Sequence, residues 1–151
     1  MLYESLKFMH ILFAMVAVGG NLTYGFWIGT AAANPQTLPH VLRRVRDFDR
    51  FIANPAYVML LLTGGFLAWI GGWGWANWVV GALVLWFLVA GLGTGLFLPA
   101  LKRQIDALDR HGFQSKTYQG LAKRTTVLGF VNMVPVMILL ALMVVKPDGW
   151  F

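Results

Sequence analysis

Apolar residues dominate four long stretches of the chain, and short polar segments separate these stretches. The stretches cover about residues 4–33, 56–72, 77–98 and 125–145. A helix needs about 20 mostly apolar residues to cross a bilayer, and each stretch is close to that length or longer. The pattern therefore predicts an all-α integral membrane protein, in which residues 1–151 form a single four-helix transmembrane bundle.

The two longer connections, about residues 34–55 and 99–124, are rich in basic residues. In the first, apolar residues recur at three- and four-residue spacing between two Asn-Pro pairs, which predicts a short amphipathic helix lying in the membrane interface. In the second, the third helix is expected to continue beyond the lipid, to stop at Gly112 and to restart at Ser115. Lys146 and Pro147 should end the fourth helix, since proline cannot continue one.

The charge distribution predicts the orientation in the membrane. The formal net charge is +6, and most of the cations lie in the two longer connections. Positive loops mark the cytoplasmic side, so both termini and the turn "GGWGWANW" are expected on the extracytoplasmic side. We expect a multi-pass protein of the bacterial cytoplasmic (inner) membrane. Its basic loops should contact anionic lipid headgroups and no nucleic acid. The sequence contains no cysteine, which excludes disulfides, thiolate metal sites and c-type haem attachment.

A stripe of polar and small residues follows one side of the first span. At 100° per residue it contains Tyr3, His10, Ala14, Ala17, Asn21, Tyr24 and Ile28. A matching line on the fourth span contains Thr125, Leu128, Asn132, Leu139, Met143 and Lys146. Polar groups in lipid normally face the interior of a bundle. We therefore expect His10, Met143 and Lys146 in an outer layer, and Asn21 and Asn132 in a deeper one.

The role of His10 has several interpretations. It could be a neutral histidine bonded to Tyr3, a carbonyl or water, with the two asparagines holding helices together. It could instead be an axial ligand of haem, with Met143 as sixth ligand and Lys146 near the propionates. Copper held by His10 and methionine thioethers is a third interpretation. A carboxylate-based ion path is not expected, because every Asp and Glu falls outside the predicted span cores.

Two glycine pairs suggest a different function. Gly25 with Gly29 and Gly91 with Gly95 have the GxxxG spacing that lets helix backbones approach closely. They are consistent with a non-catalytic membrane module that packs against itself as a homo-oligomer, or against a partner.

Four segments of the sequence together resemble the DUF2269 family of predicted bacterial integral membrane proteins. They are "LKFMHILFAMVAVGGNL", "RDFDRFIANPAYVMLLLTG", "PALKRQIDAL" and "MVVKPDG". In addition, "KFMHI" followed by a glycine pair is similar to the first helix of the HemJ-type protoporphyrinogen oxidases and the CopD-type copper-resistance proteins. That resemblance implies a haem b or copper site at His10. The HemJ-type enzymes also use an intramembrane lysine on a later helix, which the second and third spans here lack.

The sequence hypothesis is therefore a b-type haem-binding membrane protein that serves electron transfer or haem-linked redox chemistry with a redox partner. His10 is the predicted metal ligand. The other predicted cofactor-binding residues are Met143, Lys146, Asn21 and Tyr24. Whether the protein is an enzyme stays open at this point.

Overall fold

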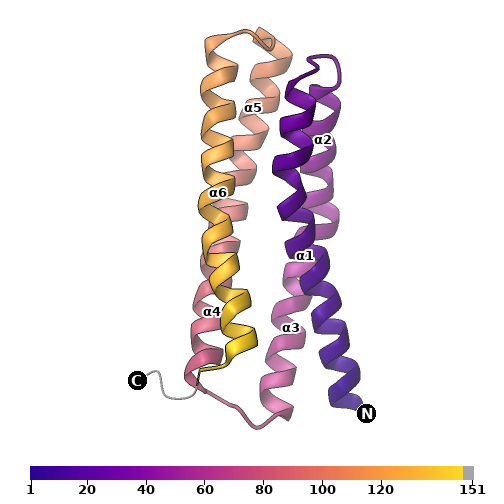
Figure 1. Ribbon diagram of the computed structural model, residues 1–151, viewed down its shortest axis with the longest axis vertical. Helices are drawn as coiled ribbons and strands as arrows, with labels where there is room; N and C mark the ends of the chain where they lie inside the picture. The colour runs from indigo at the N-terminus through magenta and orange to yellow at the C-terminus, as the bar shows by residue number, and fades with distance from the viewer. Residues whose placement is uncertain (148–151) are drawn as a thin grey trace.

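Four long helices run side by side in the computed structural model, which describes residues 1–147 (Figure 1). The first is α1 (Leu2–Ala32) and the last is α6 (Lys116–Val145). The second consists of α2 (Leu38–Phe48), the π-helical turn η1 (Asp49–Ala53) and α3 (Asn54–Ile70). The third consists of α4 (Asn77–Ala90), the π-helical turn η2 (Gly91–Phe97) and α5 (Leu98–His111). All four are long and apolar enough to cross a membrane, so the four-helix prediction is confirmed. Residues 148–151 of the predicted domain lie outside the described range.

The connections separate cleanly between the two ends of the bundle. The basic α1–α2 and α5–α6 connections lie together at one end, called here the basic end (Figure 1). The start of α1, the α3–α4 turn and the end of α6 lie at the other end. The pairing of the two basic connections on one side is as expected, whereas the membrane face to which that side belongs stays a prediction.

The predicted interface helix is instead the first part of a longer helix that extends from Leu38 to Ile70. Its apolar face does not lie on lipid: Leu38 and Leu42 are fully buried in a core shared with α1, α5 and α6. The Asn54–Pro55 pair was expected to break the chain. The backbone absorbs this proline in η1, a wider turn that ends immediately before Asn54. The predicted amphipathic helix is therefore present as α2, but the expected break at Asn54–Pro55 was wrong, since α2 continues through η1 into α3.

Predictions that depended on local chemistry are confirmed. The third helix ends at His111, and Gly112 follows with a φ of 76°, a left-handed conformation that glycine adopts easily. Ser115 caps α6, since its side chain accepts a hydrogen bond from the Tyr118 backbone N–H at 3.2 Å. The last helix ends at Val145, immediately before Lys146 and Pro147.

The bundle consists of two helical hairpins. α1 packs along α2 and α3, and α6 packs along α4 and α5. At the basic end the hairpins share an apolar core, and an exposed salt bridge of 2.7 Å joins Arg43 to Asp109. Between the ends, α1 and α6 make few contacts with each other. A second, smaller core joins the hairpins further along the bundle, where Val18 of α1 packs with Val89 of α4 and Val136 of α6.

The predicted close packing at the GxxxG pairs does not occur within this chain. A Cβ atom placed at Gly25, Gly29, Gly91 or Gly95 would meet no other atom within 4 Å. The closest approach is at Gly20, where a Cβ would lie 2.5 Å from the Cε1 atom of Phe48. Gly25 and Gly29 border a cavity instead of a neighbouring backbone. Packing against a second copy stays a prediction.

Candidate functional site

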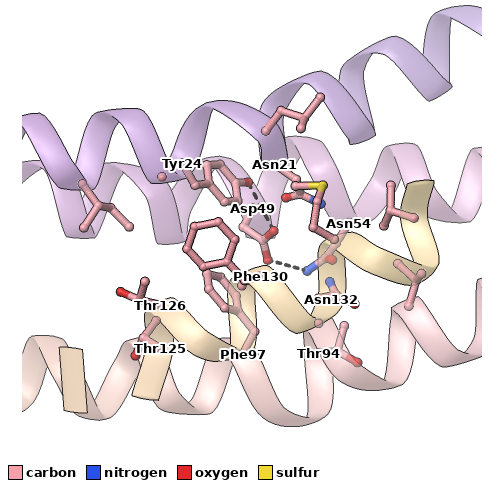
Figure 2. A pocket seen from close by; sticks show the side chains of 18 of the residues that line it. Asn21, Tyr24, Asp49, Asn54, Thr94, Phe97, Thr125, Thr126, Phe130 and Asn132 are labelled. Atoms are coloured by element: carbon pink, nitrogen blue, oxygen red, sulfur yellow. Dashed lines mark hydrogen bonds between the residues drawn. The ribbon is translucent and has the colours of Figure 1, made fainter. Parts of the chain in front are cut away.

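A cavity of about 670 Å³ lies between the two hairpins. Its volume falls in the range of about 300–1,000 Å³ that is typical of small-molecule sites. All four long helices contribute to its lining, which mixes apolar side chains with amides, hydroxyls and one carboxylate. Phe130 lines the cavity and is also exposed, so the cavity opens to the surface beside α6. Figure 2 shows that the polar side chains come from both hairpins.

Asp49 contributes the one carboxylate, and its side chain is only 7% exposed. The Tyr24 hydroxyl donates a hydrogen bond to Asp49 Oδ1 at 3.2 Å, and Asn54 Nδ2 donates to Oδ2 at 3.4 Å (Figure 2). Within residues 1–147, Asp49 is the only charged residue in the lining, and no cationic side chain pairs with it. A buried ionised carboxylate without a cation is costly, so this group depends on its hydrogen-bond donors or on a cation that enters the cavity.

From the sequence, Asp49 was expected in the connection of residues 34–55, outside the span cores, and it was not identified as a buried side chain. Its arginine-rich surroundings suggested a surface segment. The helical spacing nevertheless contained the signal. Leu38, Leu42, Val45 and Asp49 are separated by four, three and four residues, so they share one face of the helix. Since the other three residues on this face are buried, an aspartate among them indicates a carboxylate that faces the interior.

Aromatic rings support the residues around Asp49. The Tyr24 ring is nearly parallel to that of Phe97, with centroids 6.5 Å apart, and it meets Phe48 edge-on at 6.2 Å. These contacts fix the direction of the hydroxyl that reaches Asp49. Phe97 belongs to η2 and Asp49 to η1, so both π-helical turns contribute side chains to the same cavity. Such turns are frequent at functional sites.

Some of the remaining polar groups of the cavity have hydrogen-bond partners, and others do not. Asn21 Nδ2 donates to the Tyr57 hydroxyl at 2.8 Å, and the Trp86 indole donates to the Tyr57 carbonyl at 3.1 Å. In contrast, Gln104 Oε1 and Asn132 Oδ1 are buried oxygens without a hydrogen-bond donor. Buried acceptors are normally paired, so two unpaired ones in one cavity indicate a missing donor.

His10 lies outside the lining of this cavity and faces α3. Its Nδ1 atom is 2.7 Å from Thr63 Oγ1, and the Thr63 hydroxyl is also 2.6 Å from the Met59 carbonyl. A hydroxyl has one proton, so if Thr63 donates it to the Met59 carbonyl, the Thr63 oxygen accepts from His10 Nδ1–H. The other ring nitrogen, Nε2, then carries the lone pair. Thr63 was not identified from the sequence, since no local pattern connects it to a residue 53 positions earlier.

The predicted outer layer of His10, Met143 and Lys146 stays a prediction. In the described chain no hydrogen bond, ion pair or ring contact joins His10 to Met143 or Lys146. The Lys146 ammonium instead lies 4.3 Å from the centroid of the Trp73 ring and 5.3 Å from that of Trp78. The Tyr3 ring packs edge-on against the Trp73 ring, and the two ring centroids are 6.2 Å apart.

The predicted deeper layer does form. Asn21, Tyr24 and Asn132 all line the central cavity. Across residues 1–147 there is no group of three or more His, Cys, Asp or Glu side chains that could hold a metal ion.

The comparisons with known proteins identify a family but no activity. A family model described as a predicted integral membrane protein (DUF2269) matches residues 4–147. No curated protein and no solved structure matches the chain. The likeness to the HemJ-type and CopD-type proteins therefore stays a prediction.

Proposed function

The chain belongs to the DUF2269 family of predicted integral membrane proteins, and we propose that within this multi-pass membrane protein the central cavity binds a small amphiphilic molecule. The observation that supports this proposal is the mixed lining of one cavity of about 670 Å³. Apolar side chains such as Ile28, Val89 and Val136 offer a surface to a hydrocarbon portion. The buried carboxylate and amides offer hydrogen-bonding groups to a polar head.

The route of entry also fits an amphiphile. The exposed Phe130 stands at the lining of the cavity, on a stretch of α6 whose apolar side chains are exposed. A molecule dissolved in the bilayer can reach the cavity from this side without crossing an aqueous phase. The polar head loses its water when it leaves the headgroup region, and the hydrogen-bonding groups of the cavity would replace that water.

Photolabelling tests this proposal. A medium-chain alcohol that carries a diazirine on its chain should label peptides that line the cavity, and an excess of unlabelled alcohol should suppress this labelling. Gly93→Leu should reduce the cavity labelling at least about fivefold. Gly93 lines the cavity, and a Cβ at this position would make an ordinary contact of 3.6 Å with Asn132 Nδ2, so the leucine side chain should occupy part of the cavity. Mass spectrometry of the labelled peptides provides the measurement.

Gly91→Leu is the matched control, because Gly91 lies in the same π-helical turn but does not line the cavity. The cavity peptides of this variant should be labelled to the same extent as those of the wild type. Labelling that spreads evenly over the lipid-facing surfaces, or that Gly93→Leu leaves unchanged, would contradict the proposal.

A second candidate function is haem binding at His10, which serves electron transfer or haem-linked redox chemistry. It is favoured by one observation: the bond to Thr63 leaves Nε2 with a free lone pair, the state in which histidine ligates iron. The donor chemistry of His10 therefore fits a haem iron. The other predicted ligands fit less well, since Met143 and Lys146 make no polar or ring contact with His10, and Asn21 and Tyr24 line the separate cavity. A bound haem would supply one-electron chemistry at this position.

A further inference from the structure

We propose that the head of the amphiphile is a protonated amine and that Asp49 is its counter-ion. This inference rests on the proposed binding function of the central cavity and specifies the class of ligand. It uses the charge of the cavity, the balance of its hydrogen-bonding groups and the rings around Asp49.

The charge of the cavity favours a cation. Asp49 is buried, and both of its hydrogen-bond donors, Tyr24 and Asn54, are neutral. No lysine, arginine or histidine from residues 1–147 lines the cavity. A carboxylate in this environment is stabilised most by a cation that enters beside it, since an opposite charge acts strongly where water is excluded.

The hydrogen-bonding groups of the cavity favour a head that only donates. Gln104 Oε1 and Asn132 Oδ1 lack donors, and Asp49 can accept further hydrogen bonds. These acceptors come from both hairpins, since Asp49 belongs to η1, Gln104 to α5 and Asn132 to α6. Gln104 contacts Tyr118, which is 14 residues from Asn132 on α6 and so roughly 20 Å away along the helix axis, and one head can therefore meet only one of the two amide oxygens. A primary ammonium has three N–H donors and no acceptor, so it matches Asp49 together with one such acceptor.

The aromatic residues favour the same head. Tyr24, Phe97 and Phe130 lie around Asp49 in Figure 2, and Trp86 also lines the cavity. The faces of aromatic rings attract cations, above all where water is excluded. The apolar remainder of the lining is left for a hydrocarbon tail.

The same features disfavour a phospholipid head. An ethanolamine lipid carries a phosphate next to its ammonium, and no cation in the described lining would meet that phosphate. Asp49 would repel it. The structure therefore favours a small amine amphiphile with a single positive charge and no phosphate.

The experiment compares two photoprobes of equal chain length, one ending in a primary amine and one in a hydroxyl. The full-length protein is placed in phosphatidylcholine nanodiscs, whose uncharged surface does not concentrate the amine. Labelled cavity peptides are quantified as a function of probe concentration. In the wild type the amine should bind at least about tenfold more tightly than the alcohol, which is the value of one charge-assisted hydrogen bond.

Asp49→Asn should reduce this ratio to about one, because it weakens binding of the amine more than binding of the alcohol. Asp47→Asn is the matched control, because Asp47 is an exposed carboxylate two residues away that pairs with Arg46 at 2.8 Å. It should keep the wild-type ratio. Tyr24→Phe is a further variant that keeps the carboxylate but removes one of its neutral donors, so the preference for the amine should persist or increase.

Three results would overturn the inference. They are equal binding of the two probes by the wild type, a preference that survives Asp49→Asn, and a preference that Tyr24→Phe abolishes. Equal and saturable labelling of the cavity by both probes would leave the proposed binding function standing. If neither probe labels the cavity, the binding function itself fails.

Discussion

Replacing Leu42 with aspartate should lower the free energy of unfolding by more than about 4 kcal/mol. Leu42 is fully buried in the apolar core of the basic end, which α1, α2, α5 and α6 share. Truncation of such a leucine to alanine alone costs about 2–5 kcal/mol, and the aspartate adds a buried charge without a partner. The measurement is the loss of helical circular dichroism as sodium dodecyl sulfate is titrated into mixed micelles.

Leu42→Met is the control for this substitution. It conserves volume and polarity, so it should cost less than about 1.5 kcal/mol. The comparison decides between two positions for α2. A helix lying on the membrane surface would lose membrane contact on Leu42→Asp but would leave the four-helix core intact. Equal unfolding midpoints for Leu42→Asp and Leu42→Met would contradict the buried position of α2.

His10→Ala should abolish haem binding if the second candidate function is correct. Protein expressed with added haem and purified in detergent should then show a Soret absorption band, because the Nε2 lone pair of His10 is available to the iron. Thr63→Val removes the acceptor that orients the ring, so it should weaken haem binding about 10–100-fold. Absorption spectra during a haem titration measure both effects.

His40→Ala is the control here, since His40 is an exposed residue of α2 at the basic end. It should keep the wild-type spectrum. A colourless wild type, or a Soret band that persists in His10→Ala, would remove haem at His10 as a function. The amphiphile proposal does not depend on this result, because His10 does not line the central cavity.

Features set by the local chain were predictable from the sequence. Long apolar runs predicted the four helices. The glycine, serine and proline residues predicted the helix boundaries at Gly112, Ser115 and Pro147. The inward stripe of α1 correctly placed Asn21 and Tyr24 in the interior. Each helix end is determined by residues within a few positions of it. The inward face of α1 follows from the requirement that polar groups avoid lipid.

Features set by contacts between distant segments were not predictable. Asn54–Pro55 has the local chemistry of a break, but burial of Leu38 and Leu42 against α1 and α5 keeps the helix continuous through η1. The partner of His10 is Thr63 in another helix, and the depth of Asp49 depends on that continuity. The spacing along a helix can indicate its buried face, but a single sequence does not show which distant segment will cover that face.

The central claim is that Asp49 holds the head of an amine amphiphile between the two hairpins. Diffraction from crystals grown with an alkylamine that carries bromine at its tail tests this claim most directly. We expect an anomalous peak for bromine among the apolar side chains of the cavity, and density for the ammonium group beside the Asp49 carboxylate. Bromine peaks confined to the lipid-facing surface, or a bromine beside Asp49 with the amine pointing away, would contradict the claim.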